Sequence, residues 1–559
     1  MVKPGAKPWT HKINCELNIP QIPNVSPEQL CDMVNSARPG PNFVNMQVSV
    51  HSSLNFDSWC KYRHAFEAQD PSLLAQLQWG FPVGADNPDS ISVPFTNHKT
   101  AVNNPEIVQD YIVKHLATKA IYGPYDSNPL EVPVVVSPLQ VAFSSSGKPR
   151  VCNDLSYGHI SVNSCISSDW CEYPGYFGEL ELPCIDNVVQ QILDKGKGCM
   201  LWKTDFSSYY KQISIDPGDL PLLGFAYDGK LYFEDRLPFG LRSSCLNAQR
   251  VTKAVIKIYN LLYKAYVAGY IDDCLGISLP DNALVEYTGF CDVTDDLGLL
   301  RTLPKCVAPC YCLVWIGVEL DTMDMCMRLP CDKVDRMVQF LKEWITKNAA
   351  SKRDVQVLLG VLNHAASILI VGRAFTGYMV DLLRSDHFPV PLPAEFFMDV
   401  HTWLEILQGG VTSQNTLKSP ISIPCDFIIQ VAFAANIFAV KVLDQTTIFE
   451  IVDQVDMCSS VAYTYAFWQA SVMAAHKFPG SWITCTVLTV NDVHTINRAR
   501  NVLPALRPMV RHTWCLQAKS DMVIRAKKGM CERDIDKMVR ELNSGTPVSM
   551  ESVPECFKV

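Results

Sequence analysis

The 559-residue sequence contains no apolar run long enough to cross a membrane. Its most apolar stretch, Phe427 to Leu443, is shorter than the roughly 20 residues of a membrane-spanning helix and is interrupted by Gln430, Asn436 and Lys441. A secretory pattern at the N-terminus is also lacking. We therefore expect no contact with a membrane and a location inside the cell, in the cytoplasm, the nucleus or both.

The sequence also lacks CxxC pairs at zinc-finger spacing, although it contains 22 cysteines. They occur singly or in loose pairs such as Cys310 and Cys312, which is typical of free thiols in a reducing compartment. Structural zinc is not expected unless ligands converge from distant positions.

Excess positive charge is missing as well, because the net charge is −9. A nucleic-acid site would need a local basic cluster against this acidic background. The apolar share of 48% and the charged share of 19% are ordinary for globular proteins. At roughly 150 residues per domain, the length indicates about three or four folded units.

The first half of the chain divides into an N-terminal extension, residues 1–85, and an α+β domain, residues 86–325. Within the extension, apolar spacing between Leu54 and Phe81 predicts amphipathic helices that pack on the following domain. Within the domain we expect helices at 105–121 and 247–262. Expected strands are 132–136, 139–143, 150–155, 200–205, 211–215, 231–233, 265–270 and 274–277, with a polar hairpin tip at 144–148.

The second half begins with a helical region, residues 326–390, where Ser351 and Asp354 form a capping-box pattern. Prolines 389, 391 and 393 indicate a boundary and a linker over 391–420. Residues 421–545 follow as a mixed-sheet domain, before a tail at 546–559. Its expected strands are 422–453 (three in succession), 483–490 and 522–528, and its expected helices are 459–475, 493–502 and 533–542.

Three aspartates form the pattern most indicative of chemistry. Asp272 and Asp273 lie between two apolar runs, so a tight hairpin would carry adjacent carboxylates, which repel each other unless a cation neutralises them. Asp205 ends another strand pattern. If the two segments meet, they could hold a pair of hard cations as in two-metal phosphoryl transfer. The alternative is that all three are ordinary turn or capping carboxylates.

In their order along the chain, these and other segments resemble the reverse transcriptase family, most closely the polymerases of DIRS-like retroelements that carry a tyrosine recombinase. The matching segments are Lys148-Pro149-Arg150 with Asp154, Asp205 through Gln212, Leu237 through Leu241, Tyr270 through Asp273, Lys305, Trp315 through Val318 and Gly372 through Phe375. The resemblance covers residues 90–385. It implies a right-hand polymerase with fingers and palm over 86–325 and a thumb over 326–390, followed by an RNase H-like domain.

The family also implies site residues. Asp205, Asp272 and Asp273 would be catalytic and would bind two Mg²⁺ ions, or Mn²⁺. The nucleotide would contact Lys148, Arg150, Phe206, Tyr210, Phe239 and Gly240, with Tyr210 excluding a 2′-hydroxyl; Tyr270, Lys305 and Gly317 complete the motifs. Alternatively, Lys148 and Arg150 are solvated surface charges and Tyr210 is a core residue.

Two segments depart from the family pattern. Many relatives carry a small residue with proline and then a phenylalanine after the second palm motif, whereas residues 242–248 read RSSCLNA. Ser156 stands where many relatives have a basic residue. We therefore expect differences in how the template is positioned and a weaker cluster of phosphate-binding charges.

The C-terminal domain lacks the acids that RNase H chemistry needs around two metal ions. Ala432 stands where the first aspartate belongs, residues 461–466 lack the glutamate, and Val490 and Asn491 occupy the place of the third acid. We expect no nuclease activity. The alternative is that other acids rebuild the site, from the set Asp426, Asp444, Asp453 and Asp492.

The resemblance thus predicts an RNA-directed DNA polymerase acting on an RNA template, a DNA primer and deoxynucleoside triphosphates. A Gag-like protein and a tyrosine recombinase of the same element would be its partners. The alternative is a catalytically inert, domesticated scaffold that binds nucleic acid, which the acidic charge and the altered C-terminal domain favour.

Overall fold

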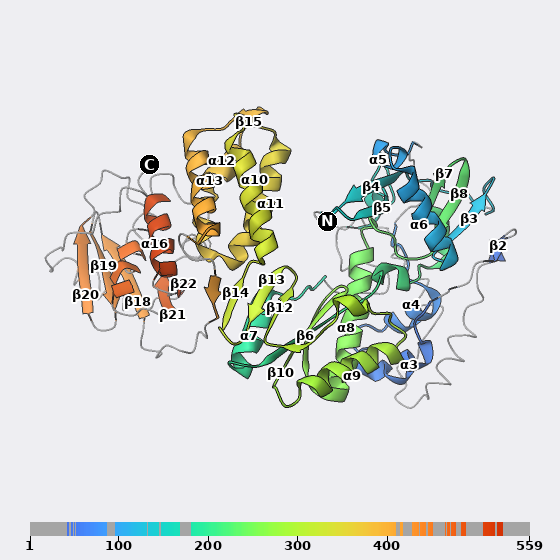
Figure 1. The fold of residues 1–559 in the computed structure, drawn as a ribbon, viewed down its shortest axis with the longest axis horizontal. Helices are drawn as coiled ribbons and strands as arrows, with labels where there is room; N and C mark the ends of the chain where they lie inside the picture. Colours follow the sequence, from blue (N-terminus) through green and yellow to red (C-terminus); the bar gives the residue numbers. More distant parts are fainter. Residues whose placement is uncertain are drawn as a thin grey trace. The chain divides into compact units, whose positions relative to one another are not determined.

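The computed structural model describes residues 50, 52–85, 96–130, 132–144, 147–167 and 180–409, together with shorter pieces. These pieces are 42–43, 46–47, 414–417, 428–434, 437–442, 445–450, 464, 467–469, 471–473, 475–476, 482–487, 507–519 and 523–528. The fold mixes helices and sheets (Figure 1). It divides into unit 1, Met1–Gln191 with Gly198–Tyr311, and unit 2, Ile192–Lys197 with Cys312–Val559. None of the described helices is both long and apolar enough to cross a membrane.

The helices near the start of unit 1 share its main hydrophobic core. They are α3 (Phe56–Lys61), the 3-10 helix η1 (Arg63–Ala65) and α4 (Leu73–Trp79). Their buried side chains, such as Trp59 and Leu74, belong to the same core as Val255. The predicted packing is confirmed, and residues 54–81 are part of unit 1 rather than a separate extension.

The central sheet of unit 1 has the strand order β11-β6-β10-β9. Its strands are β6 (Met200–Asp205), β9 (Tyr266–Tyr270), β10 (Asp273–Ser278) and β11 (Val307–Cys310). Neighbouring strands are antiparallel. Helices α8 (Ser244–Tyr263) and α9 (Ala283–Asp296) pack on this sheet (Figure 1). The predicted hairpin and the predicted helix before it are confirmed.

A second part of unit 1 carries the hairpin of β4 (Leu139–Phe143) and β5 (Pro149–Asn153), as predicted. Beside it lie α5 (Lys99–Val102), α6 (Pro105–Ala117) and a sheet in the order β3-β8-β7. The strands of that sheet are β3 (Ile121–Tyr125), β7 (Gly224–Tyr227) and β8 (Lys230–Glu234).

Two predicted strands of unit 1 are wrong. Over 132–136 the structure has only an isolated bridge from Val136 to Gly224, since Pro133 and Pro138 restrict pairing. Over 211–215 there is no strand: the 3-10 helix η5 (Tyr209–Gln212), which follows Ser208 at φ 46°, ends at Gln212, and Ser214 and Ile215 form only isolated bridges.

Unit 2 contains a sheet in the order β12-β13-β14-β17 and a group of helices. The strands are β12 (Cys312–Trp315), β13 (Val318–Asp321), β14 (Cys326–Arg328) and β17 (Gln414–Thr416). The helices are α10 (Cys331–Ile345), α11 (Lys352–Ile368), η8 (Ile370–Phe375), α12 (Gly377–Leu382) and α13 (Ala394–Leu407). The capping box of Ser351 and Asp354 is present.

The predicted linker over 391–420 is wrong. Helix α13 packs against α10 and α12, so it belongs to the helical group. Pro393 is its N-cap residue, and the proline-rich stretch therefore starts a helix rather than ending a domain. The predicted boundary at 325 also moves, because β12 and β13 fall in unit 2.

The C-terminal part of unit 2 carries a mixed sheet in the order β20-β19-β18-β21-β22. Its strands are β18 (Ile428–Ala434), β19 (Ile437–Val442), β20 (Gln445–Glu450), β21 (Trp482–Val487) and β22 (Val523–Lys528). The first three pair antiparallel and the last two pair parallel. The predicted strands are confirmed, while α16 (Arg507–Lys519) was not predicted. The predicted helices at 493–502 and 533–542 lie outside the described residues.

Candidate active site

The central sheet brings the three predicted aspartates together. Strands β6 and β10 pair so that Asp205 lies directly opposite Asp273, which places their Cβ atoms about 4.5–5.5 Å apart. The backbone N–H of Phe206 donates to the carbonyl of Asp272 at 2.9 Å. Two segments separated by more than sixty residues therefore meet at one end of the sheet, at the tip of the β9–β10 hairpin.

The turn that carries Asp272 is strained and is held by side chains of α8. Ile271 has φ 55°, a conformation that costs a β-branched residue about 1–2 kcal/mol. Its N–H donates to Oε1 of Gln249 at 2.8 Å, and its carbonyl accepts from Oγ1 of Thr252 at 2.5 Å. Helix α8 thereby fixes the backbone immediately before the acids.

Lysines lie against two of the three carboxylates. Nζ of Lys305 is 2.9 and 3.1 Å from the two oxygens of Asp205, whose side chain is 9% exposed. Nζ of Lys203 is 3.1 Å from Oδ2 of Asp273. Among the residues that the structure describes, no lysine forms an ion pair with Asp272, so the three acids outnumber the lysines that contact them by one.

Burial and the charge of neighbouring acids disfavour the charged forms of Asp272 and Asp273. Burial, followed by the nearby charge of Asp205, raises the pKa of Asp272. Burial also raises the pKa of Asp273 to about 6, although Lys203 opposes the shift. Such surplus negative charge in a poorly hydrated place attracts cations.

Oxygen donors of this kind suit magnesium or manganese. Within the described ranges, however, no group of three or more His, Cys, Asp or Glu side chains is arranged to hold a metal ion. The donor chemistry of the three carboxylates fits the predicted ions, although Lys305 contacts Asp205 and Lys203 contacts Asp273. That all three aspartates bind metal stays a prediction.

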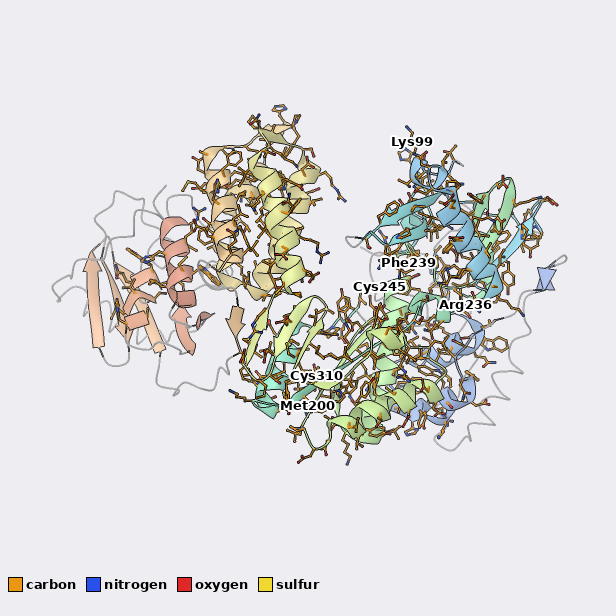
Figure 2. All side chains as sticks on the ribbon, in the orientation of Figure 1. Lys99, Met200, Arg236, Phe239, Cys245 and Cys310 are labelled. Atoms are coloured by element: carbon orange, nitrogen blue, oxygen red, sulfur yellow. The ribbon has the colours of Figure 1, made fainter. Side chains whose placement is uncertain are left out.

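Three predicted nucleotide-binding residues form a row beside the acids. The ring centroids of Tyr210 and Phe239 are 5.1 Å apart, and the guanidinium carbon of Arg150 lies 5.7 Å from the Phe239 ring. Figure 2 shows Phe239 and Cys245 near the N-terminal end of α8. Tyr210 is half-buried and burial raises its pKa, so its hydroxyl stays protonated. Arg150 is exposed on β5.

Gly240 is held in a conformation and a space that exclude other residues. Its φ is 99°, and a Cβ there would lie 2.8 Å from the carbonyl oxygen of Asn153. Nδ2 of Asn163 donates to the Gly240 carbonyl at 2.6 Å, and Oδ1 of Asn163 accepts from the N–H of Arg242 at 2.8 Å. The loop that carries Phe239 is thereby tied to the neighbouring strand and to the segment around Asn163.

The other predicted nucleotide-binding residues differ in their exposure. The Phe206 side chain is 1% exposed and packs in the core against Tyr209, so any contact of this residue with a nucleotide would be made by its backbone and stays a prediction. Lys148 is exposed at the base of the hairpin tip, where its N–H donates to Oγ of Ser144. Oδ2 of Asp154 lies 2.8 Å from Nε2 of His98, and it accepts a hydrogen bond when that ring nitrogen carries the proton.

Tyr270 and Gly317 complete the predicted motif residues. Tyr270 pairs with Asp273 across the hairpin. Gly317 belongs to unit 2, where it turns the chain between β12 and β13 at φ 79°. Its carbonyl accepts from Nζ of Lys333 at 3.3 Å.

Sequence reasoning missed the residues that position the acids. Gln212 is one: its Nε2 donates to the carbonyls of Ser207 and Leu300 at 2.6 and 2.9 Å, and its Oε1 accepts from the N–H of Leu300 at 2.8 Å. Lys203, Gln249 and Thr252 are the others. The only signal was their polarity inside apolar patterns.

In the C-terminal sheet, Ala432 lies on β18 opposite Ala439 of β19. Thr464 lies in a helical segment. The other positions of the predicted lost nuclease site lie outside the described residues. These are residues 461–463, 465–466 and 490–491, together with Asp426, Asp444, Asp453 and Asp492. The expected loss of nuclease activity stays a prediction.

No protein-family model matches the chain. The search of curated proteins also found no match. Among solved structures, a foamy viral protease-reverse transcriptase in complex with double-stranded DNA is 11% identical, with a TM-score of 0.48, over 94% of this chain and 82% of that one. A foamy viral protease-reverse transcriptase in complex with an RNA/DNA hybrid is 12% identical, with a TM-score of 0.48, over 94% of this chain and 68% of that one. Similarity at this level is too weak to establish function.

Proposed function

We propose that the protein is an RNA-directed DNA polymerase that joins deoxynucleotides to a primer 3′-hydroxyl. The observation that carries the proposal is the meeting of Asp205, Asp272 and Asp273 at one end of the central sheet. The family motifs that the sequence resembles occur in the same order, and the row of Arg150, Phe239 and Tyr210 lies on elements of the same unit.

Asp205, Asp272 and Asp273 would hold two Mg²⁺ ions, which Mn²⁺ could replace. Ions bound there would supply the charge stabilisation that nucleotidyl transfer needs. Lys203 keeps Asp273 in place beside them. Lys305, which lies on both oxygens of Asp205 and is 58% exposed, would have to release part of that contact.

The side chains around Tyr210 would bind the incoming nucleotide. Arg150 suits recognition of the triphosphate because its planar fork matches phosphate oxygens, and the exposed Lys148 adds a second positive charge. The half-buried ring of Tyr210, fixed against Phe239, would exclude a 2′-hydroxyl, and Gly240 lets the pocket floor approach Asn153.

The remaining elements are assigned by resemblance. The helices of unit 2 would be a thumb, and the C-terminal sheet would be an RNase H-like domain that holds duplex without cutting it. We infer a DIRS-like element as the source, with a Gag-like protein and a tyrosine recombinase as partners. Cleavage of an RNA:DNA hybrid that Asp492→Asn abolishes would contradict the loss of nuclease activity.

Primer extension on an RNA template tests the polymerase proposal. We expect Asp272→Asn to lower the rate about a hundredfold to a thousandfold or more, the effect of removing one group from a preorganised charge-stabilising site. Asp281→Asn is the matched control, because it makes the same change at an exposed aspartate of the same unit. Equal extension by wild type and Asp272→Asn would refute the assignment.

A further inference from the structure

Tyr209 is a buried tyrosine that lies in the sequence between Asp205 and Tyr210. It is 4% exposed, and its ring centroid lies 4.9 Å from that of Phe206. A core position of this kind would accept phenylalanine equally well if only the ring mattered. The hydroxyl, however, has specific partners on α8, so it has a function beyond filling space.

The hydroxyl of Tyr209 starts a chain of hydrogen bonds that ends at the catalytic turn. It lies 2.8 Å from Oγ1 of Thr252, which lies 2.5 Å from the carbonyl oxygen of Ile271. Thr252 has one hydroxyl proton, and its shortest contact is the one to Ile271. Tyr209 also has one hydroxyl proton, and Thr252 at 2.8 Å is a nearer acceptor than the Ala248 carbonyl at 3.1 Å. We therefore assign Tyr209 as the donor to Thr252, and Thr252 as the donor to Ile271.

This chain closes a loop around the acids. On one side, the N–H of Phe206, next to Asp205, donates to the carbonyl of Asp272. On the other side, the hydroxyls of Tyr209 and Thr252 hold the carbonyl of Ile271, one residue before Asp272. Because Ile271 is strained at φ 55°, the turn needs such partners to keep its conformation.

The Tyr209 hydroxyl has a further partner on α8. It lies 3.1 Å from the carbonyl oxygen of Ala248, a residue that is fully buried.

We propose that Tyr209 and Thr252 are positioning residues, whose two hydroxyls set the catalytic turn relative to the strand that carries Asp205. The role in catalysis rests on the proposed polymerase function, whereas the hold on the turn does not. Both side chains are buried, so the pair would act through the placement of Asp272 and Asp273.

Four variants separate the hydroxyls from the bulk of the side chains. Tyr209→Phe and Thr252→Val remove one hydroxyl each and keep the shape, and Thr252→Ser restores the hydroxyl. Tyr259→Phe is the matched control, because Tyr259 is a buried tyrosine of α8, the helix that carries Thr252, and its hydroxyl donates to the carbonyl of Glu286, away from the turn.

Hydrogen–deuterium exchange of the peptide spanning β9 and β10 tests the hold on the turn without any need for activity. We expect Tyr209→Phe and Thr252→Val to speed exchange of the Ile271 amide about three- to tenfold, the effect of one net hydrogen bond. Thr252→Ser and Tyr259→Phe should exchange at the wild-type rate. Unchanged exchange in both Tyr209→Phe and Thr252→Val would overturn the proposal.

Primer extension then tests the catalytic consequence. The two hydroxyl-removing variants should lower kcat about three- to tenfold while KM for the nucleotide changes less than about twofold, and Thr252→Ser should recover the rate. A wild type without activity but with the expected exchange pattern would refute the polymerase and leave the hold on the turn standing. Faster exchange with unchanged kcat in an active enzyme would overturn the positioning role. If Tyr209→Phe fails to fold, the pair Thr252→Val and Thr252→Ser decides.

Discussion

Unit 1 contains two groups of acidic side chains that follow opposite rules. In the hairpin group, Asp205, Asp272 and Asp273 lie near one another at strand ends. In the group at the end of β8, each acid lies against its own cation. Glu234 is 2.5 Å from Nζ of Lys211, Asp235 contacts Arg236, and these four side chains are at most 7% exposed.

The difference shows which group stabilises the fold. Burial raises the pKa of Asp235 to about 7 even though Arg236 opposes the shift, so burying a paired acid is already costly. The hairpin group accepts a further cost, because there the described acids outnumber the lysines that contact them. A surplus charge of this kind does not help folding, and it is what a cation site requires.

The largest effect should come from breaking the balanced group. Glu234→Ala removes the partner of Lys211, whose side chain is 7% exposed, and leaves its charge buried. We expect the free energy of unfolding of unit 1 to fall by about 3–5 kcal/mol. Urea unfolding, monitored by hydrogen exchange of unit 1 peptides, measures this fall in the free energy of unfolding. Asp126→Ala is the control, because it breaks the exposed pair with Lys230 and should change nothing measurable. A loss as small as that of the control would mean that the balance in this group is incidental.

A smaller effect should appear when the pH is lowered. Burial, then the charges of Lys211 and Lys114, lowers the pKa of His115 from 6.5 to about 3. Because the unfolded chain takes up a proton near pH 6.5 and the folded protein does not, stability is full above that pH and is lost as pH falls toward 3. After allowance for solvent screening, about 1 kcal/mol should be lost between pH 7.5 and 5.5. Urea unfolding at the two pH values should show the difference shrinking in His115→Leu; an unchanged difference would assign it to other groups.

The elements that position the hairpin group could largely be predicted from sequence. The β9–β10 hairpin and α8 follow from apolar alternation and helical spacing, which depend on neighbouring residues alone. The strand expected over 211–215 is absent, and the positive φ of Ser208 and the 3-10 helix that follows it are not encoded by the pattern. The linker expected after residue 390 failed because prolines both end and begin helices.

The supporting contacts could not be predicted, since they join residues far apart in sequence. The Gln212 side chain binds the backbone of Leu300, 88 residues away, and the Gln249 side chain binds the backbone of Ile271, 22 residues away. Gly372 is another case: it matched a family stretch, yet its reason is local packing, because a Cβ there would lie 2.2 Å from the Trp403 ring. Nearby, the Arg511 guanidinium lies over the Phe375 ring and pairs with the buried Asp399.

The smallest effect should separate stability from activity within the hairpin group itself. Asp272→Asn keeps the shape of the side chain and removes a charge that burial and Asp205 disfavour. In EDTA at pH 8 we expect unit 1 to gain about 0.5–1 kcal/mol of stability, while primer extension with Mg²⁺ is lost.

Urea unfolding of wild type, Asp272→Asn and the exposed-site control Asp281→Asn measures this gain. Mg²⁺ should stabilise the wild type more than Asp272→Asn, since only the wild type keeps all three predicted ligands. A loss of stability in Asp272→Asn like that of Glu234→Ala would place Asp272 among the structural acids. The contrast between the two groups would then disappear, because the carboxylates of both groups would serve only to stabilise the fold.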